Sequence, residues 1–212
     1  DLPRYKDRIF PKRIGAGWNR DLLEKRPHVM SEDLAITFYI DLGRYGDGNM
    51  SIPIHYGLTE AWGVTAEELY EIAVSNLSDS GEGTFENIND VIGDLIASLI
   101  PDEEYSQDDY SNDMYVLSNK KRVDGASMIL NREMMKGIID RIGEDFYILP
   151  SSIHECIILP AIPGMDVAEL TAMVREINAT QVSVDDRLSD NVYRYSLSEG
   201  LKFACPRIAH MN

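Results

Sequence analysis

The chain has 212 residues, of which 44% are hydrophobic and 26% charged, so neither disorder nor a fibrous repeat is needed to explain its composition. Its charge is the deviation: 36 Asp and Glu against 20 Lys and Arg give a formal net charge of -16 at pH 7. So negative a surface repels phosphate backbones and anionic lipid head groups, and we therefore expect no direct binding to nucleic acid or to membranes.

The compartment can be predicted from the same composition. No apolar run approaches the roughly 20 residues needed to cross a bilayer, and the charged opening is unlike a secretion signal. Two cysteines far apart, Cys156 and Cys205, predict two buried thiols rather than a disulfide framework, which favours a reducing, cytoplasmic setting. Because the chain starts with Asp1 and not Met, we expect it to be a trimmed form of a longer protein.

The first quarter of the chain predicts a broken helix followed by a hairpin. Apolar residues fit helical spacing up to Leu23, although Pro11 and Gly15 argue against one unbroken helix. Residues 34–41 then alternate between apolar and other side chains, the period-two pattern of a half-buried strand. Glycines between residues 43 and 48 supply a turn, and residues 51–55 form the returning strand. The apolar set in the opening segment comprises Ile9, Phe10, Ile14, Trp18, Leu22 and Leu23.

Two helices and an acidic segment come next. Thr65 and Glu68 have capping-box spacing and predict a helix over about residues 66–77. Apolar residues from Ile88 to Leu99 predict a second amphipathic helix that ends before Pro101. Residues 101–113 carry six acids and no base, so this segment is expected to be a linker or an exposed loop.

The second half predicts another set of strands and helices. A short strand at 114–117 is followed by a helix that starts at Gly125 and ends at Gly143, then by a hairpin of strands 146–149 and 153–159. Asp166 begins a further helix, and residues 192–196 and 201–204 form a last hairpin. The fold class is therefore α+β, with mixed or antiparallel sheets packed against about four to five amphipathic helices.

Two domain organisations remain open. In the first, residues 1–100 form an N-terminal α+β lobe, residues 101–113 a linker or loop, and residues 114–212 a C-terminal α+β lobe. In the second, both parts form one compact domain.

Several short stretches resemble a family of uncharacterised bacterial proteins catalogued as domain of unknown function 5688. The similarity covers nearly the whole chain, and it implies an α+β fold but no activity. It also implies that this chain is the C-terminal part of a longer protein, because members of the family extend further at the N-terminus. The stretches are Lys25-Arg26-Pro27-His28, Glu32-Asp33-Leu34-Ala35, Trp62-Gly63-Val64-Thr65, Met114-Tyr115-Val116-Leu117, Phe146 to Glu155 (FYILPSSIHE) and Ile177 to Val182.

The best catalytic candidates lie within this FYILPSSIHE stretch and just after it. A hydroxyl, an imidazole and a thiol occur together at Ser152, His154 and Cys156. On a strand these three would share one face while Glu155 points away. A nucleophile, its base and the orienting group usually converge from separate segments, so a turn serine and a half-buried histidine are the more ordinary interpretation.

Other patterns give weaker signals. His154-Glu155 lacks a second histidine four residues away, and the remaining histidines are scattered, so we predict no metal and no cofactor. Asp108, Asp109 and Asp113 lack the glycine and closing glutamate of a calcium loop. The glycines at 43–48 precede a strand with Pro53, which favours a hairpin turn over a phosphate cradle. Lys120-Lys121-Arg122 is a compact basic patch that could receive an acidic ligand or pair with the protein's own acids.

Two functional hypotheses follow. The first is a non-enzymatic binding or regulatory protein that engages a protein partner through its acidic surface or through a groove between its halves. The alternative is a hydrolase-like enzyme with His154 as base and Ser152 or Cys156 as nucleophile. The enzyme hypothesis requires His154 in an open pocket, within hydrogen-bond reach of a hydroxyl or thiol and of an orienting carboxylate.

Overall fold

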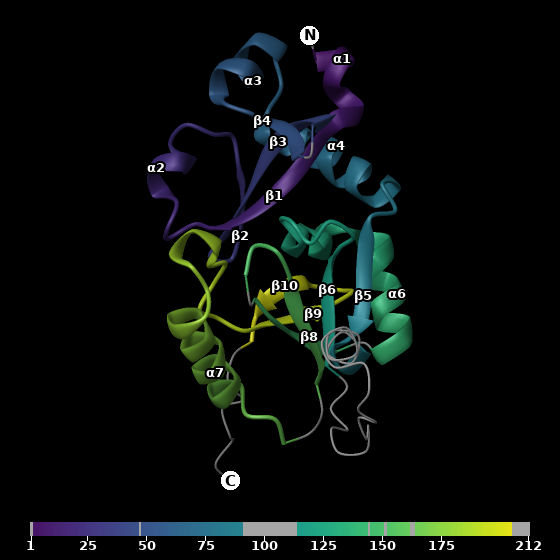
Figure 1. Ribbon diagram of the computed structural model, residues 1–212, viewed down its shortest axis with the longest axis vertical. Helices are drawn as coiled ribbons and strands as arrows, with labels where there is room; N and C mark the ends of the chain where they lie inside the picture. The colour runs from purple at the N-terminus through teal and green to yellow at the C-terminus, as the bar shows by residue number, and fades with distance from the viewer. Residues whose placement is uncertain are drawn as a thin grey trace.

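The computed structural model describes residues 2–46, 48–90, 114–143, 145–150, 152–161 and 164–204. Within these residues the strands form two antiparallel sheets, one of four strands and one of six. They lie one above the other along the long axis of the molecule, with helices around them (Figure 1). The predicted α+β class is therefore confirmed.

The upper sheet, here called the N-terminal sheet, is built around one long strand. The central strand β3 pairs with β1 on one side and with β2 and β4 on the other. Its strands are β1 (Ile9–Gly15), β2 (Val29–Ser31), β3 (Leu34–Tyr45) and β4 (Gly48–Pro53). The predicted strand and its hairpin partner are thus present, and the turn glycines Gly43 and Gly46 adopt positive φ angles of 86° and 60°.

Residues 9–15 correct the sequence prediction, because they form a strand and not part of a helix. Ile9, Pro11 and Arg13 are buried while Phe10 and Lys12 are half-buried, which is a period of two. The buried charge of Arg13 hides this alternation in the sequence. Pro11 is tolerated because β1 is the outermost strand of its sheet and therefore needs ladder hydrogen bonds on one side only.

Short helices surround the N-terminal sheet. They are α1 (Leu2–Tyr5), η1 (Lys6–Arg8), α2 (Arg20–Leu23), α3 (Tyr56–Trp62) and α4 (Ala66–Asp79). The capping box predicted for α4 is formed, since the Glu68 amide donates to Thr65 Oγ1 at 3.2 Å and the Thr65 amide donates to Glu68 Oε2 at 2.8 Å.

The two faces of the N-terminal sheet differ. One face packs on α4 through a core of Ile9, Ile36, Phe38, Ile40, Ile54, Leu69 and Ala73. The opposite face carries Phe10, Lys12, Thr37, Tyr39, Asp41 and Ser51, as the strand register requires. At one end of this second face, Leu23 of α2 buries Ile14 and Ala35. The rest of the face is polar and aromatic, and among the described residues no helix packs an apolar core against it.

The lower sheet, the C-terminal sheet, has the strand order β10-β9-β7-β8-β6-β5. Its strands are β5 (Gly83–Asn87), β6 (Tyr115–Asn119), β7 (Phe146–Leu149), β8 (Cys156–Pro160), β9 (Tyr193–Ser196) and β10 (Gly200–Phe203). Its helical elements are η2 (Gly125–Leu130), α6 (Arg132–Ile142), α7 (Val167–Thr180) and η3 (Val184–Asp186). β5 joins this sheet although it precedes the acidic segment in sequence.

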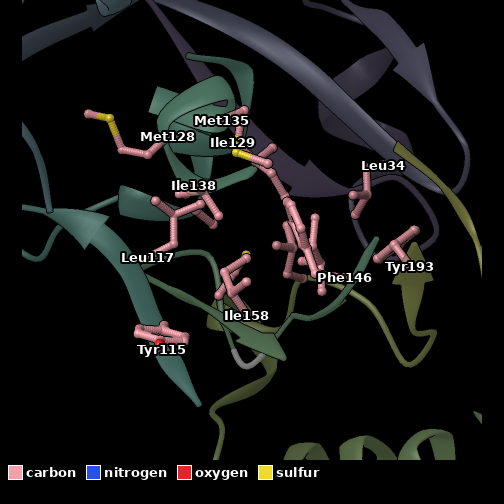
Figure 2. Close-up of a cluster of buried hydrophobic side chains, with 14 of the residues drawn as sticks. Leu34, Tyr115, Leu117, Met128, Ile129, Met135, Ile138, Phe146, Ile158 and Tyr193 are labelled. Carbon is pink, nitrogen blue, oxygen red and sulfur yellow. The ribbon is translucent and has the colours of Figure 1, made fainter. Parts of the chain in front are cut away.

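Alternating residues of the C-terminal sheet serve two cores. Phe146, Ile148 and Ile158 pack with Met135 and Ile138 of α6 (Figure 2). Leu149 and Leu159, on the other face, pack with Val174 of α7. The sheet is thus covered by α6 on one face and by α7 on the other.

The helix predicted from Gly125 to Gly143 is broken in the structure. Residues 125–130 form the 3-10 segment η2, and Asn131 then caps α6 by accepting a hydrogen bond from the Met134 amide at 3.0 Å. An asparagine side chain that bonds its neighbouring backbone amide favours a helix start over a helix interior. The helix end at Gly143 is confirmed.

η2 lies at the junction of the two sheets. All of its residues except Leu130 are buried, and Leu130 packs against the cores of both sheets. Ser127 Oγ accepts a hydrogen bond from the backbone N–H of Arg13 at 3.0 Å. This segment therefore joins the free edge of β1 to the C-terminal sheet.

A second junction is formed by the carboxylate of Asp33. It accepts hydrogen bonds from Ser189 Oγ at 2.7 Å, from Asn191 Nδ2 at 3.1 Å and from the hydroxyl of Tyr193. Burial and this contact raise the pKa of Tyr193, so its hydroxyl stays a donor. The turn before β3 is thereby tied to the segment that leads into β9.

Several predictions fall on residues outside the described part of the chain. Among them are most of the helix expected from Ile88 to Leu99, the acidic segment 101–113 with Asp108, Asp109 and Asp113, and also Ser151, Cys205 and His210. The helix starting at Asp166 and the last hairpin are described and confirmed.

Replacing Thr65 by alanine removes the cap of α4, and we expect it to lower the free energy of unfolding by about 1 kcal/mol. Urea denaturation followed by circular dichroism measures the change. Glu71→Ala, at an exposed position of the same helix, is the control and should have a much smaller effect. Equal losses in the two variants would show that the capping box does not stabilise α4.

Candidate functional site

The structure places His154 in a loop and not in a strand, which corrects the prediction for residues 153–155. β8 begins at Cys156, so the argument that Ser152, His154 and Cys156 share one strand face does not hold. The loop is fixed locally, because the backbone N–H of His154 donates to Ser152 Oγ at 3.0 Å. The backbone O of His154 accepts from Ser118 Oγ at 2.7 Å.

Both ring nitrogens of His154 have partners. Nδ1 lies 3.1 Å from the backbone N of Asp124 and accepts its hydrogen, while Nε2 lies 3.3 Å from Asp186 Oδ1. With Nδ1 as acceptor, the neutral ring carries its proton on Nε2 and donates it to Asp186. His154 thus has an orienting carboxylate, and its second nitrogen holds the backbone of the loop before η2.

In the described part of the chain, no hydrogen bond joins either of the other two catalytic candidates to this ring. Ser152 Oγ is used as an acceptor for the His154 backbone amide. Cys156 is buried, and burial raises the pKa of its thiol from 9.0 to about 12. A nucleophilic cysteine needs a lowered pKa, so the environment of Cys156 acts in the opposite direction.

The loop of residues 119–124, here called the basic loop, is strained and well anchored. Arg122 and Asp124 adopt positive φ angles of 52° and 54°, which L residues other than glycine rarely do. The side chain of Asn119 holds the loop from inside, donating to the Val123 carbonyl at 2.7 Å and accepting from the Val123 amide at 3.2 Å. Strain of this kind persists only where surrounding contacts enforce it, and it is frequent at binding sites.

A cavity of about 300 Å³ lies between the basic loop and the open face of the N-terminal sheet. We call it the inter-sheet groove. Its volume is at the lower end of the range for small-molecule sites. Residues of β1, β3 and β4 line it, together with the basic loop, η2 and the end of α4. The lining residues used below are Phe10, Lys12, Arg26, Tyr39, Asp41, Met50, Ser51, Pro53, Glu82, Lys121 and Asp124.

One ion pair crosses the groove. Lys12 Nζ of β1 lies 2.9 Å from Asp124 Oδ1 of the basic loop, and the two side chains are 34% and 23% exposed. His154 accepts a hydrogen bond from the backbone N–H of the same Asp124. The histidine that the sequence singled out therefore helps to position this residue of the groove. The contacts run from Asp186 through His154 and Asp124 to Lys12.

The groove also has an aromatic surface. The rings of Phe10 and Tyr39 face each other across β1 and β3, with centroids 6.1 Å apart. Burial, and then the charges of Asp124 and Asp41, raise the pKa of Tyr39 to about 12. Its hydroxyl therefore stays protonated at neutral pH and is available as a hydrogen-bond donor.

Most residues of the groove could not be identified from the sequence. Lys12 and Phe10 lie in the segment expected to be helical, and Tyr39 was recognised only as a strand residue. Two signals were present: the basic patch containing Lys121, and Arg26 in the Lys25-Arg26-Pro27-His28 stretch. Nothing in the sequence places these two side chains around the same cavity.

Among the residues that the structure describes, no group of three or more His, Cys, Asp or Glu side chains is arranged to hold a metal ion. Within the same residues, no helix combines the length and the apolar character that a bilayer crossing requires.

Comparison with known proteins shows the family of this chain. Residues 1–197 match the model of a family described as "Family of unknown function (DUF5688)", and the chain belongs to this family. No curated protein and no solved structure matches the chain. The family membership expected from the short stretches is confirmed, and it assigns no activity to the groove.

Gly125→Ala should destabilise the protein by about 1–3 kcal/mol, because an added Cβ would overlap the His154 carbonyl and Ser118 Oγ and lie 2.9 Å from the Asn119 amide nitrogen. Gly137→Ala, in α6 with open space around the Cβ position, is the control and should be neutral or stabilising. Chemical denaturation of both variants measures the difference. A Gly125→Ala protein as stable as the wild type would contradict this packing of the basic loop.

Cys156 should be almost unreactive toward iodoacetamide in the folded protein at pH 8, because burial excludes the reagent and keeps the thiol protonated. Mass spectrometry of the peptide that contains Cys156 measures its labelling before and after unfolding in urea. Rapid labelling of the native protein would contradict the buried position.

The same burial predicts an effect of pH on stability. Between pH 9 and about 12 the unfolded chain loses the Cys156 proton while the folded chain retains it, so the free energy of unfolding falls as the pH rises. Cys156→Ala should make this fall shallower just above pH 9, and an unchanged slope would argue against the raised pKa.

Proposed function

We propose that this protein is a non-enzymatic binding protein and that the inter-sheet groove is its binding site. The observation that carries the proposal is a cavity of about 300 Å³ lined by strands of the N-terminal sheet, the basic loop and η2, with charged, polar and aromatic residues together. Sites for small ligands and for short segments of a partner typically combine an apolar wall with a few placed polar groups. The strained and anchored basic loop supports the same location.

The hydrolase-like alternative, centred on Ser152 and His154, has one contact in its favour. The carboxylate of Asp186 lies 3.3 Å from Nε2 of His154, as an orienting group would. A general base, however, needs its other ring nitrogen free to take a proton, and Nδ1 accepts the Asp124 amide hydrogen. This geometry supports a structural role for His154 more than a catalytic one.

The setting of the protein is part of the proposal. The formal charge of -16 disfavours nucleic acid and anionic membranes as ligands, so a protein segment or a small molecule is the expected partner. The buried free thiol of Cys156 fits a reducing, cytoplasmic compartment.

A groove-blocking variant tests the binding proposal. Ser51 is exposed and lines the groove from β4, so Ser51→Trp should fill part of the cavity without disturbing a core. Ser198→Trp, in the exposed turn between β9 and β10, is the matched control. The measurement is a fragment screen of the ¹⁵N-labelled proteins by ¹H–¹⁵N correlation spectra, using both neutral and charged fragments.

The expected result is that fragments shift the amides of groove residues in the wild type and in Ser198→Trp, and no longer do so in Ser51→Trp. Fragments that bind elsewhere, or that bind Ser51→Trp equally well, would refute the groove as the binding site.

A further inference from the structure

The groove contains positive charges that the protein leaves unpaired. Arg26 and Lys121 both line it, and neither has an ion-pair partner among the residues that the structure describes. Of the other cations nearby, Lys12 pairs with Asp124, and Arg122 pairs with Glu86 at 2.6 Å. Arg26 and Lys121 are distinguished by their place in the lining of one cavity, where both charges are available to a ligand.

Arg26 is the more informative of the two. Its side chain is half-buried, and burial lowers its pKa, with no neighbouring carboxylate acting against this effect. A guanidinium that is partly shielded from water and has no ion pair among the described residues is available to bind an external anion. Its planar fork is suited to two parallel hydrogen bonds with a carboxylate.

The acids of the groove limit the charge of such an anion. Asp41 and Glu82 also line the cavity, and Asp41 Oδ1 already accepts the Gly43 amide at 2.7 Å. With Lys12 neutralised by Asp124, the remaining groups are two cations and two carboxylates. A ligand with several negative charges would be repelled by these carboxylates, whereas a single carboxylate can be held near Arg26.

The apolar part of the lining indicates the body of the ligand. Phe10 and Tyr39 form the aromatic pair on the sheet face, and Met50 and Pro53 of the neighbouring strand line the same cavity. Flat aromatic and polarisable side chains favour an aromatic or bulky apolar group.

We infer that the inter-sheet groove binds a small organic monocarboxylate with an aromatic or apolar body. Arg26 holds its carboxylate, Lys121 adds positive potential from the opposite wall, and the Phe10–Tyr39 surface packs on its body. This inference rests on the proposed function and deepens it, because it names the chemical class that the groove accepts. The carboxylate belongs either to a free metabolite-sized acid or to the C-terminus of a peptide.

The test compares probes that differ in one group. They are 3-phenylpropionate, its neutral amide 3-phenylpropanamide, phenyl phosphate, and the tripeptide Gly-Gly-Phe with a free or an amidated C-terminus. Binding to the intact chain is measured at constant ionic strength from the shifts of groove amides in ¹H–¹⁵N correlation spectra. The variants are Arg26→Gln and Lys121→Gln, with Lys25→Gln and Lys120→Gln as controls that remove a neighbouring charge outside the groove lining.

We expect 3-phenylpropionate to bind at least about tenfold more tightly than its amide, since a charge-assisted hydrogen bond is lost in the amide. Arg26→Gln should weaken binding by about tenfold and Lys121→Gln by about threefold, while both controls stay within about twofold of the wild type. Tighter binding of the free-acid tripeptide than of 3-phenylpropionate would identify a peptide terminus as the source, and the reverse order would identify a free acid.

Three results would overturn the inference. If the acid and the amide bound equally well in the groove, the groove would still be a binding site, but its ligand would not be recognised by a carboxylate. If phenyl phosphate bound more tightly than 3-phenylpropionate, the group that the groove recognises would be a phosphate and not a carboxylate. If neither charged nor neutral probes shifted any groove amide, the proposed function would fail together with the inference.

Discussion

The packing of η2 between the two sheets is the constraint on which the rest of the structure depends. Its backbone lies along the free edge of β1, where Ser127 Oγ accepts a hydrogen bond from the Arg13 amide. Its apolar side chains enter the core of the C-terminal sheet. Leu130 contributes to both cores. η2 ends at Leu130, and the side chain of Asn131 then caps the start of α6. Short 3-10 segments are typical of such connections.

The groove exists because that packing brings two unrelated surfaces together. One wall is the face of the N-terminal sheet that α4 does not cover, and the other is the basic loop that leads into η2. The close fit around Gly125, against the His154 carbonyl and Ser118, fixes where the loop lies. His154 and Asn119 then hold it in a backbone conformation that would otherwise be unfavourable.

This arrangement also explains why His154 supports a binding site better than a catalytic one. Catalysis by a histidine requires a nitrogen that exchanges a proton with substrate, whereas here one nitrogen faces a carboxylate and the other a backbone amide. The thiol two residues further on is buried and kept protonated. The groove lining instead presents charged side chains and aromatic rings, which suit the binding function proposed above.

The sequence by itself determined the elements whose signals are local: the alternation in β3, the capping box of α4, the start of α7 at Asp166 and the last hairpin. It misled at β1, because the buried Arg13 looks like a surface residue, and at β8, because the apolar Ile153 lies in the loop before the strand and not in the strand. Only the tertiary structure decided the groove. Lys12, Arg26, Tyr39 and Lys121 are far apart along the chain, and their meeting depends on how two sheets dock, which no local pattern encodes.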